Sequence, residues 1–464
     1  MKVYDSYKPI LLPWLTYIPA HWDLQRNKNI FRECKAEVGD NSDQYTLLSL
    51  SLKGIIPRDM DGGGKFPASF DKYKIVKKGN MAFCLFDIDE TPRTVGLSEF
   101  DGMLTGAYTI MEVSNINSMY AYYYYLSLDN VKALKPLYTG LRKTISIDKF
   151  QGTKLPVPPE DEQEQIVRFL NWKVSAINRL INQYRQEIKS LSTLKTRIID
   201  DTTIKGLSHT ELSHNEDERW NIDYPAHWNI QRMRECFKFR KGLSITKANL
   251  EESGVPVISY GQVHSKKNSG VGICDELIRF VNPSYLNANA SSLVKLHDFI
   301  FADTSEDVEG CGNCVFIDRD DTIFAGYHSV IAHPELSGNI KYLAYLFQSP
   351  TWRYQIRKKV NAVKVYSITQ KILKDAFILL PPSDEQDEIV EYLDGRCRSI
   401  DSFIAKIEEK IQQLLAMKMT MISDVVTGKI DVRNVEIPEY EFMADVADSD
   451  TEDDIEEENQ EEEE

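Results

Sequence analysis

Hydrophobic residues recur at alternating steps of four and three positions in two separate stretches of the chain. The first series runs from Leu170 to Ile198 and the second from Leu393 to Met421, and the two match position for position at a constant offset. A sustained four–three repeat is typical of helices that pair as a coiled coil. The pattern therefore predicts two long helices, over 161–204 and 384–427, each about 65 Å long at 1.5 Å per residue.

One face of each predicted helix forms a seam. Both series contain a lysine at the same place, Lys195 and Lys418, so each seam has a matched polar interruption. We expect the apolar seam positions to hold the two helices together. These seam residues are Leu170, Val174, Ile177, Ile181, Ile188, Leu393, Ile400, Ile404 and Ile411.

The same motif precedes each predicted helix. It is Pro158-Pro159-Glu160-Asp161-Glu162-Gln163 in the first copy and Pro381-Pro382-Ser383-Asp384-Glu385-Gln386 in the second. The prolines are expected to stop a preceding strand, and the aspartates, Asp161 and Asp384, to cap the helix N-termini. A second doubled motif, Pro-Ala-His-Trp at 19–22 and 225–228, stands at the head of each block. This internal duplication predicts two versions of one structural unit.

The two blocks between these motifs are predicted to be mixed α/β domains with short strands, for example over 45–50, 81–86 and 255–260. Outside the shared motifs the blocks differ almost everywhere. The expected organisation is a first domain at 1–157, helix 158–206, linker 207–219, a second domain at 220–380, helix 381–432 and a tail at 433–464.

The linker decides how the helices pair. The residues at 206–219 span at most about 50 Å when fully extended. A parallel pair would require the linker to retrace the whole first helix, whereas an antiparallel pair would not. We therefore expect a pseudo-two-fold molecule with a block at each end of an antiparallel helix pair.

The formal net charge of −16 comes almost entirely from the end of the chain. Residues 439–464 contain 15 Asp or Glu and no Lys or Arg. The remainder is nearly neutral, so the overall acidity does not exclude nucleic-acid binding. We expect the tail to be disordered and to increase solubility, and mimicry of a DNA polyanion remains an alternative.

Other bulk features favour a cytoplasmic protein. No apolar run is long enough to span a membrane, and the N-terminus lacks the apolar stretch of a signal peptide. The seven scattered cysteines are typical of a reducing compartment.

No catalytic or metal-binding set is recognisable. Gly62-Gly63-Gly64-Lys65 lacks the first glycine and the hydroxyl residue of a phosphate-binding loop. Asn282-Pro283-Ser284-Tyr285 faintly resembles an adenine-methyltransferase motif but has no glycine-rich cofactor loop, which favours a turn. Cys311 and Cys314 are a single pair without the second pair of a zinc site. His21 and His227 occupy matching positions and are interpreted as structural. We predict no metal and no cofactor for this chain.

Basic and aromatic residues alternate just ahead of each helix, at 138–144 and at 352–359. Lysine and arginine can position phosphates, and arginine, asparagine and glutamine can contact base edges. A solvated helix face is the competing interpretation. The candidate DNA-binding residues are Lys65, Arg93, Arg142, Lys143, Thr144, Tyr260, Gln262, Lys266, Arg353, Arg357, Lys358, Lys359, Lys364 and Tyr366.

The doubled Pro-Ala-His-Trp heads, the doubled Pro-Pro-x-Asp-Glu-Gln helix starts and the closing segment at 426–432 resemble the DNA specificity subunit of type I restriction–modification enzymes. The resemblance extends to about Asn434, and the acidic tail departs from it.

This resemblance implies two target-recognition domains and two helical spacers in a non-catalytic subunit. The implied partners are double-stranded DNA, methylation subunits and the restriction/translocation subunit. S-adenosylmethionine, Mg²⁺ and ATP would be bound only by those partner subunits.

The unlike blocks predict a bipartite, asymmetric DNA target. Two other functions remain open, a fused methyltransferase–specificity chain and a coiled-coil scaffold that joins two protein-binding domains.

Overall fold

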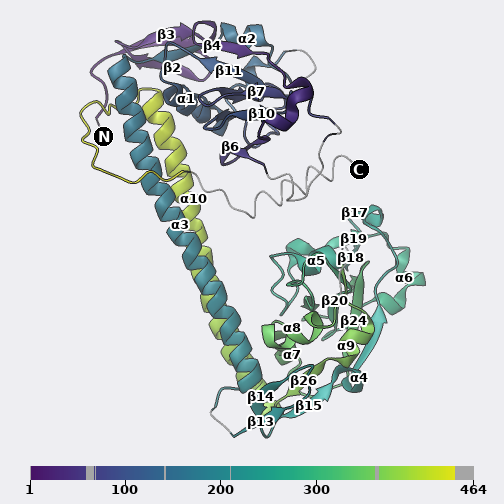
Figure 1. Cartoon of the computed structure of the whole chain (residues 1–464). Coiled ribbons are helices and arrows are strands. Elements are labelled where there is room, and N and C mark those ends of the chain that lie inside the picture. Colours follow the sequence, from purple (N-terminus) through teal and green to yellow (C-terminus); the bar gives the residue numbers. More distant parts are fainter. Residues whose placement is uncertain are drawn as a thin grey trace. The chain divides into compact units, whose positions relative to one another are not determined.

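The computed structural model describes residues 2–58, 67, 69–139, 143–208, 211–360 and 365–444. The chain divides into two compact units. Unit 1 contains Met1–Gln186 and Ile407–Glu464, and unit 2 contains Glu187–Lys406. The two long helices, α3 (Glu160–Lys205) and α10 (Ser383–Val426), each contribute one half to each unit (Figure 1).

The predicted helix bounds differ from the observed ones by a single residue at each end. The expected caps are wrong, because Asp161 and Asp384 lie inside the first helical turn. In α3 the Pro159 carbonyl already accepts the backbone N–H of Gln163 at 2.9 Å, so the helix begins one position earlier. Both aspartates still place negative charge at the positive end of the helix dipole.

Unit 1 contains a mixed α/β domain. Its central antiparallel sheet has the order β4-β11-β8-β9 and is accompanied by four two-stranded antiparallel sheets, β1-β2, β12-β3, β5-β6 and β10-β7. The strands are β1 (Tyr7–Leu12), β2 (Leu15–Pro19), β3 (Asp23–Arg26), β4 (Phe31–Cys34), β5 (Leu48–Ser51), β6 (Gly54–Pro57), β7 (Lys74–Val76), β8 (Met81–Phe83), β9 (Val95–Leu97), β10 (Gly102–Leu104), β11 (Thr109–Val113) and β12 (Lys154–Val157). Its shorter helices are α1 (Ser118–Asn130) and α2 (Ile147–Gly152).

Unit 2 repeats this frame and adds a second sheet. The sheet β16-β24-β20-β22 corresponds to the central sheet of unit 1, and β17-β19-β18-β23 has no four-stranded counterpart there. The strands are β13 (Leu212–Asn215), β14 (Ile222–Pro225), β15 (Asn229–Arg232), β16 (Phe237–Lys241), β17 (Leu250–Glu251), β18 (Val255–Ile258), β19 (Arg279–Val281), β20 (Phe299–Ala302), β21 (Thr304–Ser305), β22 (Cys314–Phe316), β23 (Phe324–Ala325), β24 (Ser329–Pro334), β25 (Tyr366–Ser367) and β26 (Phe377–Leu380). The shorter helices are α4 (Met233–Cys236), α5 (Tyr260–His264), α6 (Tyr285–Ala288), α7 (Lys341–Leu346), α8 (Pro350–Arg357) and α9 (Gln370–Asp375).

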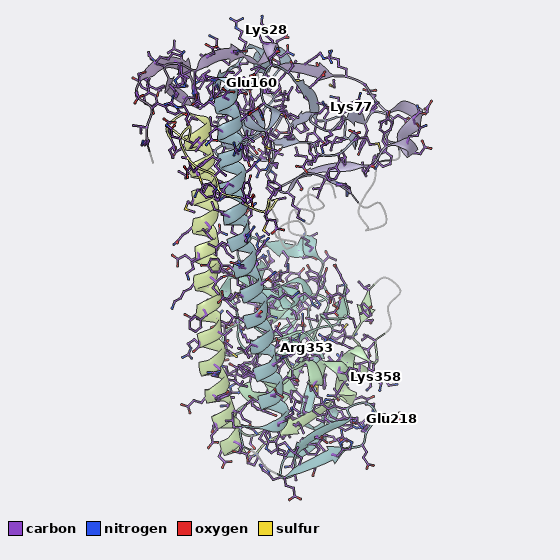
Figure 2. The ribbon with its side chains drawn as sticks, turned by 60° about the vertical axis from the view of Figure 1, so that its left-hand side comes forward. Lys28, Lys77, Glu160, Glu218, Arg353 and Lys358 are labelled. Carbon is purple, nitrogen blue, oxygen red and sulfur yellow. The ribbon has the colours of Figure 1, made fainter. Side chains whose placement is uncertain are left out.

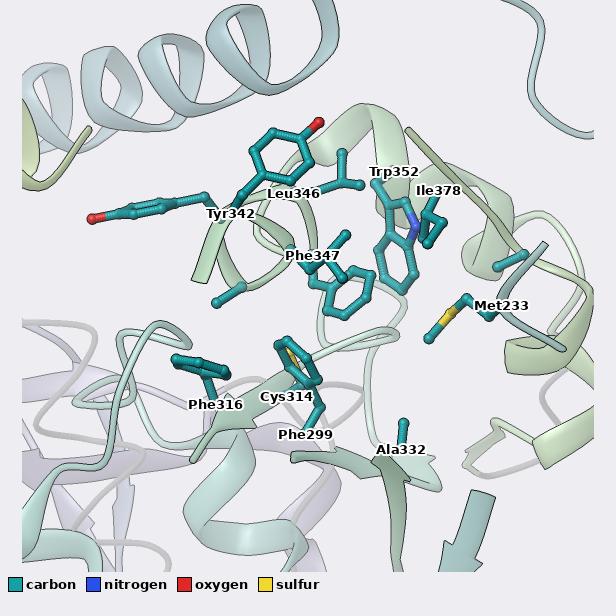
Figure 3. Packing of buried hydrophobic residues seen from close by; sticks show 14 of the residues in the cluster. Met233, Phe299, Cys314, Phe316, Ala332, Tyr342, Leu346, Phe347, Trp352 and Ile378 are labelled. Carbon is teal, nitrogen blue, oxygen red and sulfur yellow. The ribbon is translucent and has the colours of Figure 1, made fainter. Parts of the chain in front are cut away.

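The core of unit 2 is rich in aromatic side chains (Figure 3). Phe347 and the fully buried Trp352 pack with ring centroids 4.4 Å apart, and Phe299 lies 4.9 Å from Phe347. Ile199 and Ile204 of α3 belong to the same cluster. The end of α3 is therefore part of the hydrophobic core of this domain.

The doubled Pro-Ala-His-Trp motif is bound to the start of a long helix in both units. In unit 1, Glu162 accepts hydrogen bonds from Trp22 Nε1 at 3.0 Å and lies 2.7 Å from His21 Nε2. In unit 2, Glu385 makes the matching contacts with Trp228 Nε1 at 2.8 Å and His227 Nε2 at 2.6 Å. We name this arrangement the His-Trp-Glu clamp.

The end of the other long helix packs on the same tryptophan. Gly206, which follows α3, and Gly428, which follows α10, both have a φ of 76°. A Cβ atom at Gly206 would lie 3.1 Å from the Trp228 ring, and one at Gly428 would lie 3.1 Å from Trp22 and 2.3 Å from Pro19. Glycine is required at Gly428 both by the backbone conformation and by this close approach.

The two helices run in opposite directions where they pack within each unit. In unit 1, Lys418 Nζ donates to Asn178 Oδ1 at 3.3 Å, and Lys410 lies over the Tyr184 ring. In unit 2, Lys195 Nζ lies 2.7 Å from Asp401 Oδ1. The two matched lysines therefore occupy equivalent polar contacts. Seam residues that are buried are Leu170, Val174, Ile177, Ile181, Leu393, Ile400 and Ile411, and those half-buried are Ile188 and Ile404.

The ordered chain continues past the expected end at Val432. Residues 433–444 run along α3 in unit 1, and we call residues 435–444 the C-terminal strap. Met443 is its main anchor: its N–H donates to Ser175 Oγ at 3.0 Å, and its carbonyl accepts from Asn178 Nδ2 at 3.0 Å. Farther back, Gln165 donates to the carbonyl of Val435 at 2.8 Å. The predicted disorder of the acidic tail concerns residues that lie mostly outside the described ranges.

Candidate nucleic-acid interface

The basic run at 352–359 is divided by the geometry of α8. Ser349 caps the helix by accepting from the Trp352 N–H, and Pro350 occupies its first turn. Trp352 and Ile356, one turn apart, are buried. Arg353, which follows Trp352, and Arg357, which follows Ile356, line a cavity. Lys358 is instead exposed and donates to the Glu218 carbonyl at 2.8 Å (Figure 2).

The cavity that these arginines line lies entirely in unit 2 and has a volume of about 500 Å³. Lysine side chains contribute to it from α3 (Lys195) and from the loop after α5 (Lys266 and Lys267), and Asp401 from α10 is its carboxylate. We call it the basic cavity. It collects cations from three separate segments and brings together three of the sequence candidates, Lys266, Arg353 and Arg357.

Arg353 is held by uncharged partners. Its Nε donates to the Phe347 carbonyl at 2.8 Å and its guanidinium to Gln348 Oε1 at 2.5 Å. Burial lowers the pKa of Arg353 to about 10, so the group stays cationic at neutral pH. Arg357 donates to the Glu309 carbonyl at 2.5 Å, and its buried Nε has no hydrogen-bond partner.

A cluster of aromatic and histidine rings surrounds Tyr260 elsewhere in unit 2. The Tyr327 and His328 rings lie 5.5 Å and 5.6 Å from the Tyr260 ring, and His328 Nδ1 lies 3.2 Å from Asp303 Oδ1. Sequence reasoning missed Tyr327 and His328, which are distant from Tyr260 in the chain. His328 has a φ of 51°, unusual for a residue other than glycine, and such strain is concentrated at functional sites.

The remaining described candidates of unit 2 are partly buried or bound within the domain. The Gln262 side chain accepts from the Ser259 N–H at 3.0 Å and so caps α5. Tyr366 is half-buried in β25, opposite Ser305. Lys359 is half-buried, and burial lowers its pKa. Lys364 lies outside the described residues.

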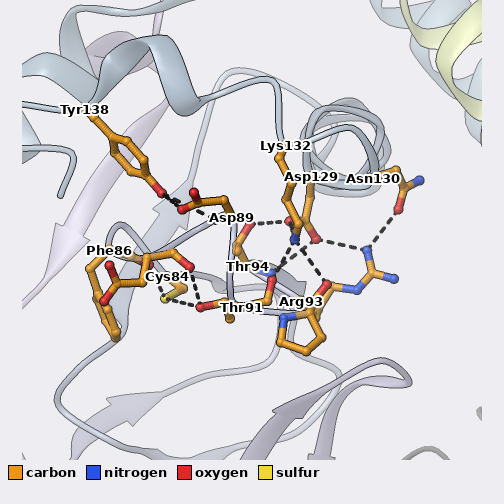
Figure 4. A network of polar contacts seen from close by, with 12 residues as sticks. Cys84, Phe86, Asp89, Thr91, Arg93, Thr94, Asp129, Asn130, Lys132 and Tyr138 are labelled. Atoms are coloured by element: carbon orange, nitrogen blue, oxygen red, sulfur yellow. Dashed lines mark hydrogen bonds and ion pairs between the residues drawn. The ribbon is translucent and has the colours of Figure 1, made fainter. Parts of the chain in front are cut away.

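In unit 1 the candidate Arg93 is bound within the domain. Its side chain is only 15% exposed and lies 3.1 Å from Asp129 Oδ2 and 3.3 Å from Asn130 Oδ1 (Figure 4). Lys132 and Thr94 bind the same carboxylate at 2.8 Å and 2.5 Å. Arg93 therefore stabilises α1 against the strand β9 and its preceding loop.

Lys143 and Thr144 lie at the surface of unit 1 beside acidic side chains. Lys143 pairs with Glu90, which raises the lysine pKa, and it lies 3.6 Å from Asp89. The Tyr138 hydroxyl, 2.6 Å away, is the main cause that lowers the pKa of Asp89 to about 2. The neighbouring carboxylates compete with phosphate for Lys143. Lys65 and Arg142 lie outside the described residues.

Metal chemistry is not indicated for the part of the chain that the structure describes. Within it, no three His, Cys, Asp or Glu side chains gather as metal ligands. Burial raises the pKa of Cys311 to about 11 and that of Cys314 to about 12, so both thiols stay protonated and are poor ligands. No helix within the described ranges is long and apolar enough to cross a membrane.

Comparison with known proteins identifies a family from a match that covers more than half of the chain, including part of unit 1 and most of unit 2. A family model described as the type I restriction modification DNA specificity domain matches residues 95–190 and 225–415. The type I restriction enzyme MjaVIII specificity subunit of Methanocaldococcus jannaschii is 24% identical over 295 residues. That alignment covers 62% of this chain and 65% of the relative. The EcoKI specificity subunit of Escherichia coli (strain K12) is 23% identical over 286 residues, which cover 58% of this chain and 57% of the relative.

A solved structure supports the same fold. The chain superimposes with a TM-score of 0.60 and 14% identity on one chain of a solved structure. The description of that structure concerns the structural basis underlying complex assembly and conformational transition of the type I R-M system. The match covers 89% of this chain and 99% of that one.

Proposed function

Because this chain belongs to the DNA specificity family of type I restriction–modification systems, we propose that its two α/β domains each recognise one half of a bipartite, asymmetric DNA target. In this role the chain is the non-catalytic recognition component. S-adenosylmethionine, Mg²⁺ and ATP would be bound by its partners, the methylation subunits and the restriction/translocation subunit. The chain of the type I R-M system, with its TM-score of 0.60, supports the fold on which this proposal is based.

One observation carries the proposal of two unlike half-sites. Both units share the His-Trp-Glu clamp and the same central strand order, yet the sheet β17-β19-β18-β23 of unit 2 has no four-stranded counterpart among the described residues of unit 1. A common frame with different inserted strands and loops is suited to presenting different side chains to DNA. The two half-sites should therefore differ in sequence.

The long helices supply the surface proposed for partner docking. Large apolar side chains are exposed on them in both units, although such residues on helices normally face a core. In unit 1 they are Leu180, Met417 and Met419, and in unit 2 Leu194, Tyr392 and Phe403. We assign these faces to the methylation subunits.

We further propose that the helices fix the spacing between the half-sites. A matched insertion of seven residues into both, near Tyr184 and Ile407, keeps the seam in phase and lengthens the pair by about 10.5 Å. At 3.4 Å per base pair this corresponds to roughly three base pairs. The half-sites themselves should not change, because neither domain is altered.

Methylome sequencing of cells that express the intact complex tests these proposals together. The wild type should methylate one split, asymmetric sequence, and the insertion variant should prefer a longer spacer with the same half-sites. As the matched control, replacing residues 220–380 by the second domain of another family member should change one half-site and keep the spacer. Methylation at the original spacing with full efficiency by the insertion variant would show that the helices do not set the spacing.

Two binding measurements address the alternative functions. Stoichiometric S-adenosylmethionine binding by the isolated chain would favour a fused methyltransferase. A complete lack of DNA binding at low salt, with the methylation subunits present, would favour a protein-binding scaffold.

A further inference from the structure

The basic cavity of unit 2 contains positive charge that the protein does not neutralise. Among the described residues, neither Arg353 nor Arg357 has a carboxylate oxygen within ion-pair distance. Two lysines at the same cavity do have such partners: Lys195 pairs with Asp401 at 2.7 Å and Lys267 with Glu276 at 2.6 Å. The arginines are therefore the uncompensated part of the site.

Keeping these two guanidinium groups together is unfavourable without a counter-charge. Burial and the charge of Arg357 both disfavour the cationic form of Arg353. The buried Nε of Arg357 also lacks an acceptor, which is costly for a donor removed from water. Such groups are retained where a ligand supplies the missing acceptor and charge.

The fold also shapes the cavity around Arg353 in a specific way. Gly312, with a φ of 96°, lies against the arginine, and a Cβ there would be 3.3 Å from Arg353 Cγ. Gly270, with a φ of 75°, leaves room for Gln348, since a Cβ there would be 1.8 Å from Gln348 Nε2. Gln348 in turn holds the Arg353 guanidinium. The position of the guanidinium is thus fixed by two neighbouring glycines and an amide.

We propose that the basic cavity binds a phosphoryl group, with Arg353 and Arg357 as its main donors. A guanidinium presents a planar set of N–H donors that matches two oxygens of a phosphate. With Lys195 and Lys267 paired to Asp401 and Glu276, the two arginines still leave two positive charges, which favours an anion of more than one charge over a carboxylate. A volume of about 500 Å³ accommodates a phosphate together with the group attached to it.

The phosphoryl group has two sources that the experiment separates. One is the backbone of bound DNA, in which case this inference deepens the proposed function and rests on it. The other is a free phosphate compound that occupies the cavity independently of DNA. The same donors would serve both, because each ligand presents anionic oxygens on phosphorus.

Inorganic phosphate is the probe, used on the full-length chain at constant ionic strength with chloride as the reference anion. Phosphate should raise the melting temperature of the wild type, since a ligand that binds only the folded state stabilises it. Arg357→Gln should weaken phosphate binding roughly ten- to a hundredfold, the usual effect of losing one charged hydrogen bond. Arg353→Gln should behave alike, and Arg357→Gln keeps the test valid if the more buried Arg353 variant does not fold.

Lys358→Gln is the matched control, because Lys358 belongs to the same basic run but is exposed and bound to the Glu218 carbonyl. It should leave phosphate binding unchanged. Equal phosphate stabilisation of the wild type and Arg357→Gln would overturn the proposal, as would a wild type that phosphate does not stabilise more than chloride does.

A DNA titration with the methylation subunits then identifies the source. If the group is a DNA phosphate, phosphate competes with DNA and Arg357→Gln reduces the salt slope of DNA binding by about one. If the ligand is a free phosphate compound, saturating DNA leaves phosphate binding unaffected. If Arg357→Gln abolishes phosphate binding but the complex never binds DNA, the phosphoryl site in the basic cavity would be supported and the proposed function refuted.

Discussion

Removing the carboxylate at the centre of the His-Trp-Glu clamp should destabilise unit 1 more than unit 2. Glu162 is 5% exposed and accepts from Tyr4 at 2.6 Å, in addition to its contacts with His21 and Trp22. Its counterpart Glu385 is 34% exposed on its side chain and contacts only His227 and Trp228. We compare Glu162→Ala with the matched variant Glu385→Ala.

The expected magnitudes follow from the donors that each change leaves without an acceptor. Tyr4 and Trp22 are 3% and 0% exposed, and a buried donor without a partner costs about 1–3 kcal/mol. Burial and Glu162 both raise the pKa of Tyr4, so its hydroxyl stays a donor and needs an acceptor. Allowing for relaxation, Glu162→Ala should lower the free energy of unfolding by about 3–5 kcal/mol. Glu385→Ala leaves one buried donor, Trp228, beside a site that water reaches, and should cost about 1–2 kcal/mol.

Hydrogen exchange in urea measures these effects separately for each unit. Amides of the hairpin β1-β2 report on unit 1, and those of β13-β14 report on unit 2. Glu162→Gln is the conservative control, because its amide oxygen can still accept from Tyr4 and Trp22, and it should cost about 1 kcal/mol. An equal or larger loss for Glu385→Ala than for Glu162→Ala would refute the argument that burial of the donors sets the size of the effect.

Two further changes concern the end of the chain. Asn178 accepts a hydrogen bond from Lys418 and donates one to the Met443 carbonyl. Asn178→Asp should therefore keep the lysine contact and release the C-terminal strap, which faster hydrogen exchange at 435–444 would show. Asp401→Asn, at the equivalent place in unit 2, is the control and should not change that exchange. An unaltered strap in Asn178→Asp would mean that other contacts hold it. Deleting residues 445–464 removes 13 Asp or Glu. We expect the target preference to stay unchanged and non-specific DNA to bind more tightly at low salt, because fewer negative charges repel the phosphates. Fluorescence anisotropy measures both affinities. Equal non-specific affinity would leave only an effect on solubility.

The periodic and duplicated features of the chain could be predicted from sequence because they depend on local spacing. The four–three pattern located both long helices, and it paired Lys195 with Lys418 as equivalent positions. Their different partners, Asp401 and Asn178, depend on the register between helices, which the pattern alone does not specify. The relation of Asn178 to Met443 depends on residues beyond the predicted end of the fold.

The candidate site was harder to predict because the charge of a residue does not indicate in which direction its side chain points from the helix. The run at 352–359 was treated as one basic surface, although a helical period applied to Trp352 and Ile356 would have separated Arg353 and Arg357 from Lys358. The ion pair of Arg93 could not be predicted for a different reason. Its partner Asp129 comes from a helix that is distant in the chain, and such a contact leaves no local signal in the sequence.

The packing of each Trp-containing head against the end of the other long helix has a consequence for synthesis on the ribosome. Unit 2 is contiguous in the chain, whereas unit 1 needs residues 407–444, which are made last. The Tyr120 hydroxyl, for example, donates to the Val426 carbonyl at 3.2 Å. At about 5–20 residues per second, roughly 15–55 seconds pass between completion of the last strand of the first domain, β12, and synthesis of residue 444. During that interval Trp22 and the apolar seam of α3 lack their partner helix, so the domain that is made first is the last to be finished.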